Sequence, residues 1–165
     1  MWYKLIRPLL FSLDAEFSHN LTLGALKKLY QLGALPKSKV VAGNSVNCLG
    51  LTFPNPIGLA AGLDKNGECV PAWSAIGFGF IEVGTVTPLA QVGNLRPRLF
   101  RLTKDKALIN RMGFNNKGVD YLLERIKSYP RHCPLGINIG KNKDTPLEKA
   151  VNDYLTCFQK IYGFA

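Results

Sequence analysis

Phe80-Ile81-Glu82-Val83-Gly84-Thr85 is the clearest strand signal in this chain. A short run of apolar and β-branched side chains that ends in glycine and a hydroxyl is typical of a buried strand. Two similar runs lie on either side of it, at residues 57–62 and 135–140. Helix-like stretches follow, near residues 67–76, 117–128 and 146–161. Repeated strand-then-helix units predict an α/β fold built on a parallel sheet.

Two hairpins and a domain boundary are predicted outside these units. Residues 46–53 form a short hairpin, and residues 97–112 contain two apolar runs that suit an inserted hairpin. A polar connector at residues 37–45, with Pro36 before it, marks a boundary. We therefore expect a helical domain at 1–40 and an α/β domain at 45–165.

Residues 1–33 are predicted to form two amphipathic helices. Pro8 limits or kinks the first helix, Asp14 is placed to cap the second, and Gly33 is placed to end it. The apolar positions at helical spacing are Leu5, Ile6, Leu9, Leu10 and Leu13 in the first helix and Phe17, Leu21, Ala25, Leu29 and Leu32 in the second.

Two interpretations of these helices stay open. In the commoner one, both helices pack on the core. In the other, their apolar faces lie in a membrane interface, with Lys4 and Arg7 toward anionic headgroups. No apolar run reaches the roughly 18 to 20 residues that are needed to cross a bilayer.

Charge and cysteine content narrow the function classes. The chain has 21 Lys plus Arg against 11 Asp plus Glu, a formal net charge of +10. This charge attracts phosphates, acidic metabolites, nucleic acid or anionic lipid, but no nucleic-acid-binding motif accompanies it, so we expect no nucleic-acid partner. The four cysteines form no Cys-x-x-Cys pair, which indicates buried reduced thiols and no metal site.

Small and polar residues gather where the predicted parallel strands end, which is where such folds bind ligands. The first strand leads into Ala61-Gly62-Leu63-Asp64-Lys65, where small residues admit a planar ring or a phosphate and Lys65 adds a cation. Thr85 and Asn138 offer a hydroxyl and an amide at the other two ends. Each feature alone is also compatible with an ordinary turn or strand end, and none matches a dinucleotide or phosphate-loop fingerprint.

A fourth segment, Asn110-Arg111-Met112-Gly113-Phe114-Asn115-Asn116, is dense in amides around an aromatic ring, which suits a small polar heterocycle. Together with residues 55–65, 81–88 and 136–143, it resembles the motifs of the dihydroorotate dehydrogenases. The four segments follow one another along the chain in the family's order. The resemblance covers essentially the whole chain. Its helical N-terminus is similar to the extension of the quinone-using, membrane-bound class 2 members rather than to the soluble class.

The resemblance implies the N-terminal part of a (β/α)8 TIM-type barrel, about three strands of eight, preceded by a small helical extension. It implies FMN at the carboxyl-end mouth. The implied FMN contacts are Ala61, Gly62, Leu63, Asp64, Lys65, Thr85 and Asn138. The implied contacts of the pyrimidine are Lys65, which would pair with the orotate carboxylate, and Asn110, Arg111, Met112, Gly113 and Phe114.

The implied activity is oxidation of dihydroorotate to orotate in pyrimidine biosynthesis, through FMN, with a membrane quinone as acceptor. The family's base is a serine in a Ser-Pro-Asn segment, which these 165 residues do not contain. We therefore assign no catalytic residue, expect the base C-terminal to Ala165, and expect this chain alone to be inactive. His19 would lie near the quinone passage, although a plain surface histidine is an equally good interpretation.

The resemblance also implies a peripheral protein on the cytoplasmic side of the inner membrane. Two alternatives stay open. A soluble relative that uses fumarate or NAD fits the barrel motifs but not the helical first 33 residues. A non-catalytic half-barrel that binds a partner is compatible with the missing base and with the sheet edge that three strands leave uncovered.

Overall fold

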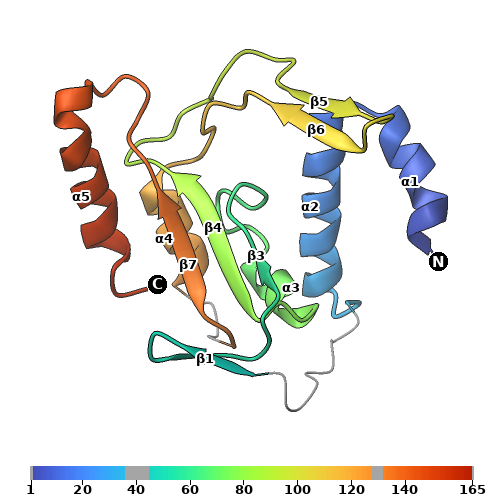
Figure 1. The fold of residues 1–165 in the computed structure, drawn as a ribbon, viewed down its shortest axis with the longest axis horizontal. Coiled ribbons are helices and arrows are strands. Elements are labelled where there is room, and N and C mark those ends of the chain that lie inside the picture. Colours follow the sequence, from blue (N-terminus) through green and yellow to red (C-terminus); the bar gives the residue numbers. More distant parts are fainter. Residues whose placement is uncertain (1, 36–44, 128–131, 165) are drawn as a thin grey trace.

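The computed structural model describes residues 2–35, 45–127 and 132–164. Two helices come first and an α/β unit follows, as predicted (Figure 1). The elements are α1 (Trp2–Ser12), α2 (Ala15–Gln31), β1 (Val46–Cys48), β2 (Leu51–Phe53), β3 (Gly58–Leu59), α3 (Val70–Ala75), β4 (Phe80–Val86), β5 (Leu99–Leu102), β6 (Ala107–Asn110), α4 (Val119–Ile126), β7 (Leu135–Ile139), the 3-10 turn η1 (Leu147–Lys149) and α5 (Ala150–Ile161). Residues 37–44 of the predicted connector lie outside the described residues.

The predicted parallel sheet is confirmed, in the order β3-β4-β7. Gly58 pairs with Phe80 on one side of β4, and Ile81 pairs with Leu135 on the other. Both predicted hairpins are also confirmed, β1 with β2 and β5 with β6. The β5–β6 hairpin lies beyond the carboxyl ends of the parallel strands, close to α1 and α2 (Figure 1).

Helices and sheet share one hydrophobic core. Val70 of α3, Ile81 and Val83 of β4, Leu122 of α4 and Cys157 of α5 are all fully buried in a single cluster. Alternate residues of β4 are buried in it, whereas Phe80, Glu82 and Thr85 are only half-buried. One face of the sheet is therefore covered by helices, and the other face carries the polar side chains.

Several predicted elements are shorter than expected, and for β3 and α3 the local cause is clear. The run at residues 57–62 forms a strand only at Gly58–Leu59, because the chain turns at Gly62, which has a φ of +106° that favours glycine. The helix expected over residues 67–76 begins at Val70. The Asp64 carboxylate accepts the backbone N–H groups of Glu68 and Cys69, both at 2.8 Å, and holds the intervening residues as a turn.

The N-terminal helices form as predicted, but their apolar stripes do not pack on the core. Asp14 caps α2 by accepting the backbone N–H of Phe17 at 2.8 Å, and Gly33 follows its end with a φ of +67°. Pro8 lies inside α1. The predicted stripe of α2 is exposed, including Phe17 at 56%, and a different pair, Leu23 and Leu26, packs against the core.

The exposed stripes rule out the interpretation in which both helices bury their apolar faces. In α1, Leu5 is 69% and Leu9 is 66% exposed. Within the described ranges, no helix combines the length and the apolarity that crossing a bilayer would require. The prediction for the cysteines was wrong at one position, because Cys48 is exposed in the β1–β2 hairpin whereas the other three are buried.

Glu68 ties α2 to the α/β unit. Its carboxylate accepts hydrogen bonds from Lys27 of α2 at 2.7 Å, from Lys117 at 2.8 Å and from the Tyr121 hydroxyl of α4. Burial by itself would raise the pKa of this carboxyl, but the three hydrogen bonds outweigh burial and lower the pKa from 4.5 to about 2. The ionised form is therefore the one that the fold stabilises.

We predict that this network makes the fold acid-sensitive. A carboxyl with a lowered pKa in the folded state contributes stability that is present above its unfolded pKa and is lost as the pH falls through the folded pKa. Here the loss runs from pH 4.5 down to about pH 2. Glu68→Gln should cost on the order of 2 kcal/mol in urea unfolding at neutral pH and progressively less over this range. Parallel curves for the two proteins across it would contradict this prediction.

Candidate functional site

A cavity of about 600 Å³ opens where the parallel strands end, between these ends and the β5–β6 hairpin. It brings together most of the residues that were predicted to bind ligands. The predicted cofactor residues that line it are Ala61, Gly62, Leu63, Lys65, Thr85 and Asn138. The predicted substrate residues that line it are Lys65, Asn110, Met112, Gly113 and Phe114.

Strands β4 and β7 place a hydroxyl and an amide side by side on the cavity wall. Gly84 pairs with Asn138 in the sheet, with an irregularity between Gly84 and Val86. The Thr85 hydroxyl donates to the Asn138 side-chain oxygen at 2.6 Å, and the Asn138 amide nitrogen donates to Glu82 at 3.4 Å. The remaining lone pairs and the second amide hydrogen stay available for the edge of a polar ring.

Lys65 supplies the positive charge of the cavity. Its ammonium donates to the carbonyl of Gly62 at 2.7 Å and lies 3.7 Å from the sulfur of Met112. An ammonium has three N–H donors, so one is left for a ligand. Burial, and next the nearby charge of Arg98, lower the pKa of Lys65 from its ordinary value. The negative charge of an anionic ligand would favour the protonated form of Lys65 and so oppose both effects.

Residues 110–114 form the outer wall of the cavity. The side-chain oxygen of Asn110 accepts the backbone N–H of Met112 at 3.5 Å. Phe114 has a φ of +52° and is 56% exposed. Asn110 and Phe114 thus present an amide and an exposed aromatic side chain to the same cavity, which suits a flat heterocycle with polar edges.

Two predicted site residues point elsewhere. Asp64 is 1% exposed, and its carboxylate also accepts the indole N–H of Trp73 at 3.2 Å, so its side chain serves the fold and not the cavity. Arg111 donates to the carbonyl of Pro97 at 3.1 and 3.3 Å and lies over the Phe100 ring. Each of the two residues directly follows a residue that lines the cavity. Only the direction of its side chain distinguishes it from that neighbour.

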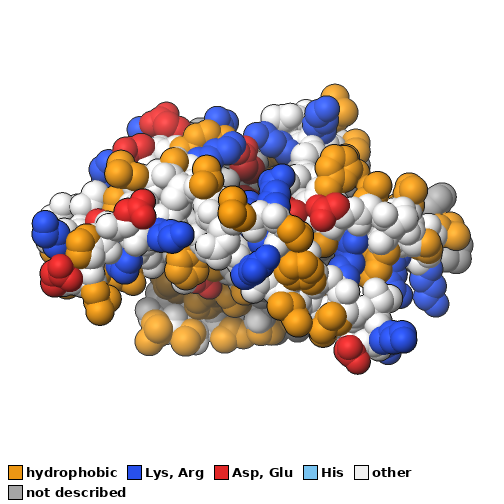
Figure 2. Space-filling view, turned by 90° about the horizontal axis from the view of Figure 1, so that it is seen from above, with side chains coloured by type: hydrophobic (Ala, Val, Ile, Leu, Met, Phe, Trp, Pro, Cys, Tyr) orange, Lys and Arg blue, Asp and Glu red, His pale blue; other side chains and the backbone are white. Residues whose placement is uncertain are grey.

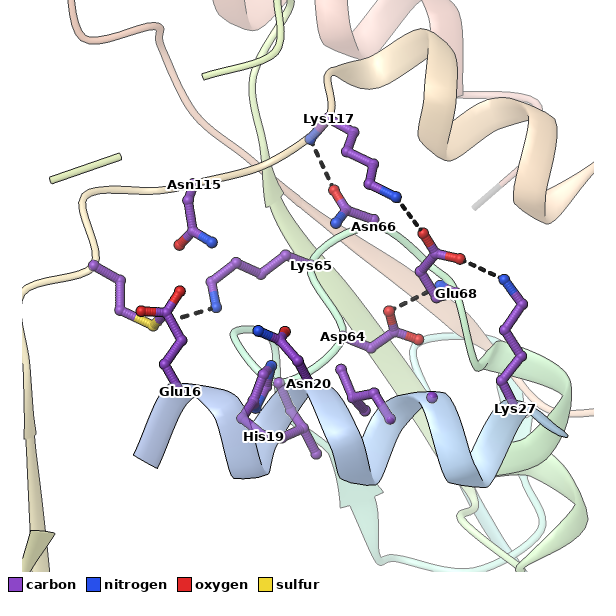
Figure 3. Close-up of a pocket in the computed structure, with 14 residues that line it drawn as sticks. Glu16, His19, Asn20, Lys27, Asp64, Lys65, Asn66, Glu68, Asn115 and Lys117 are labelled. Atoms are coloured by element: carbon purple, nitrogen blue, oxygen red, sulfur yellow. Dashed lines mark hydrogen bonds and ion pairs between the residues drawn. The ribbon is translucent and has the colours of Figure 1, made fainter. Parts of the chain in front are cut away.

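A second, more polar cavity of about 310 Å³ adjoins the first between α2 and the loops of the α/β unit (Figure 3). His19, Leu63, Lys65 and Met112 line both cavities. His19 is half-buried, and its burial, followed by the charge of Lys65, lowers the pKa of its imidazole. His19 therefore lies beside the predicted ligand residues and is not a plain surface histidine.

The sequence did not single out Glu16 of this second cavity. Glu16 of α2 lines it and is 5% exposed, and the buried side-chain oxygen of Asn115 has no hydrogen-bond partner. The only sequence signal for Glu16 was that this acidic residue lies on a different face of the helix from the predicted apolar stripe. Among the residues that the structure describes, no group of three or more His, Cys, Asp or Glu side chains is placed to hold a metal ion.

Comparisons with known proteins point to one family. The family model described as dihydroorotate dehydrogenase matches residues 44–165. The dihydroorotate dehydrogenase (quinone) of Idiomarina loihiensis is 58% identical over 164 residues, which are 99% of this chain and 49% of that protein. That of Acinetobacter baumannii is 56% identical, over 100% of this chain and 49% of its own length. The chain thus spans about half the length of the curated relatives it matches.

Solved structures agree with these relatives. The ligand-free type DHODH from Eimeria tenella superposes with a TM-score of 0.81 at 44% identity, over 92% of this chain and 43% of that one. The complex of the Eimeria tenella DHODH with ferulenol gives a TM-score of 0.77 at the same identity, over 88% of this chain and 41% of that one.

The hydrogen bonds of the buried Asp64 carboxylate predict a stability defect when this side chain is removed. Asp64→Ala removes an acceptor that satisfies three donors, two of them buried, so it should lower the free energy of unfolding by about 3 kcal/mol. Urea unfolding followed by tryptophan fluorescence measures this. Asp105→Ala, at an exposed turn, is the matched control and should change the unfolding free energy by less than about 0.5 kcal/mol. Equal stability of the two variants would show that Asp64 is not structural.

Proposed function

The chain belongs to the dihydroorotate dehydrogenase family, and on this premise we propose that it carries half of a quinone-dependent enzyme that oxidises dihydroorotate to orotate through FMN. This oxidation introduces the C5–C6 double bond of the pyrimidine ring that becomes part of UMP in de novo biosynthesis. The observation that carries the proposal is the convergence of four separate segments on one cavity, at residues 61–65, 85, 110–114 and 138.

The inner part of the cavity, at the ends of the parallel strands, fits FMN. A Cβ added at Gly62 would meet nothing within 4 Å, so the backbone at the end of β3 is open to the face of a ring. Thr85 and Asn138 would hydrogen-bond its polar edge, and Ala61, Leu63 and Lys65 would complete the contact. When bound, FMN supplies the acceptor for hydride and later passes electrons to a quinone.

The outer part of the cavity fits the substrate. The third N–H of Lys65 would bind the substrate carboxylate as a charge-assisted hydrogen bond. Asn110 would hydrogen-bond the polar edge of the pyrimidine, and Phe114 would pack beside the ring, which together hold its C–H bond toward the cofactor. These residues would bind and orient the substrate, and none of them would abstract its proton.

The helical extension suits a membrane surface and a quinone. Leu5 and Leu9 of α1 and Phe17 and Leu21 of α2 are all exposed. Hydrophobic side chains alternate with Lys and Arg at the end of the molecule that α1 forms (Figure 2). We propose that this face lies on the cytoplasmic side of the inner membrane, with its cations toward anionic headgroups. A quinone would then reach the cavity past His19, which lies on its wall.

We predict that substitutions in the two parts of the cavity separate FMN binding from orotate binding. Thr85→Val should weaken FMN binding about tenfold, because it removes one hydrogen bond of the inner part. Asn110→Ala should leave FMN binding unchanged and weaken orotate binding to the FMN-loaded chain by a similar factor of about ten. Flavin fluorescence measures FMN binding, and the orotate-induced change in flavin absorption measures the second step. If the chain binds no FMN, or if Asn110→Ala weakens FMN equally, the assignment is wrong.

We also predict binding of the chain to anionic vesicles through α1. Leu5→Glu combined with Leu9→Glu should abolish most of the fraction that sediments with phosphatidylglycerol vesicles, because two carboxylates would enter the apolar interface. The matched control is Val151→Glu combined with Leu155→Glu, which alters an exposed pair at the same spacing on α5. Equal loss in both double variants would count against a membrane-facing α1.

A further inference from the structure

The segment that lines the outer cavity is held in place by a neighbouring loop. The backbone N–H of Asn94 donates to the carbonyl of Met112 at 3.0 Å, and the Asn94 side chain donates to the carbonyl of Arg111 at 2.8 Å. Gln91 adds hydrogen bonds of 3.3 and 3.2 Å to the next two carbonyls of the segment. The position of residues 110–114 therefore depends on the position of residues 91–94.

Two glycines make this contact close. A Cβ at Gly93 would lie 2.3 Å from the carbonyl oxygen of Met112, and a Cβ at Gly113 would lie 2.8 Å from the Asn94 side chain. Both glycines have positive φ, +76° and +72°. The two backbones are in direct contact, so a shift of residues 91–94 is passed on to residues 110–114.

Arg98 holds residues 91–94, here called the supporting loop, through hydrogen bonds to their backbone. One guanidinium nitrogen donates to the carbonyls of Val92 at 2.6 Å and Asn94 at 3.0 Å. The carbonyl of Arg98 accepts the backbone N–H of Arg111 at 2.9 Å. Arg98 thus contacts the supporting loop with its side chain and residues 110–114 with its backbone.

Glu16 of α2 holds Arg98. Its two carboxylate oxygens accept the other guanidinium nitrogens at 3.0 and 2.6 Å, and the two side chains are only 7% and 6% exposed. Arg96, which is exposed, adds a contact of 3.0 Å to the same carboxylate. A buried cation without its partner is strongly unfavourable, so Arg98 keeps this position only while Glu16 is docked beside it.

We propose that Glu16 and Arg98 are positioning residues, which couple the docking of the helical extension to the geometry of residues 110–114 and so to the affinity for the pyrimidine. For its ligand, this inference rests on the function proposed above. Glu16 rises from α2 next to Lys65, on the side where the chain carrying Asn115 passes (Figure 3). A helix that faces the membrane would thereby set the shape of a pocket that faces the aqueous substrate.

The molecule offers a matched control. Lys27 of α2 pairs with Glu68 at 2.7 Å, so this pair also joins α2 to the α/β unit. The other hydrogen-bond partners of Glu68 are Lys117 and Tyr121, which lie toward α4 and not in the supporting loop. Lys27→Gln therefore removes one contact between α2 and the α/β unit but leaves Glu16 docked beside Arg98.

Hydrogen exchange of backbone amides tests the coupling in the chain without any ligand. Glu16→Gln should speed exchange of the Asn94 and Arg111 amides about tenfold or more relative to wild type, while the amides of β4 and β7 stay protected. Arg98→Lys is a milder second variant, because the ammonium keeps a charge beside Glu16 but lacks the fork that also reaches the two loop carbonyls. It should speed the same two amides. Lys27→Gln should leave both unchanged.

Ligand binding gives the second readout. In FMN-loaded protein, Glu16→Gln and Arg98→Lys should weaken orotate about tenfold with FMN affinity unchanged, and Lys27→Gln should not. Unchanged exchange at Asn94 and Arg111, or an equal increase throughout the sheet, overturns the coupling. If the local exchange pattern holds but even the wild-type chain binds no orotate, the coupling stands and the proposed function fails.

Discussion

β4 pairs in parallel with β3 on one side and with β7 on the other, and the candidate site depends on this pairing. Strands that run in one direction end at one edge of the sheet, so residues from three distant parts of the sequence meet there. Pairing of Gly84 with Asn138 brings the Thr85 hydroxyl to 2.6 Å from the Asn138 oxygen. A slip of one residue would turn these side chains toward the helix-covered face.

Buried charges position the parts of the cavity wall that the sheet does not hold. Asp64, Glu16 and Glu68 each bury most of a carboxylate, and each is surrounded by donors. Burying a charge is unfavourable unless it is paired and hydrogen-bonded, so each carboxylate admits few arrangements of its neighbours. Through these contacts a turn, a helix and a supporting loop acquire defined places around the cavity.

The two cavities and the exposed helix faces put two kinds of chemistry close together. Lys65 and the amides of Asn110 and Asn138 suit a small anionic heterocycle and a flavin edge, whereas the leucines of α1 suit lipid and an apolar acceptor. His19 and Lys65 lie on the wall between the cavities. In the proposed enzyme, this arrangement would let a soluble substrate and a membrane-dissolved quinone reach the same cofactor by different routes.

The sequence by itself determined the elements that have local causes. Periodicity predicted the strands and helices, Asp14 and Gly33 marked the ends of α2, and four motifs predicted most of the residues that line the cavity. Only the tertiary structure decided that the apolar stripes of α1 and α2 face outward, that Asp64 and Arg111 turn away from the cavity, and that Glu16 meets Arg98 across 82 positions. The physical reason is that side-chain spacing reports the geometry of one helix or strand, whereas the direction of a charged side chain depends on which distant donors and acceptors can pay its cost of burial.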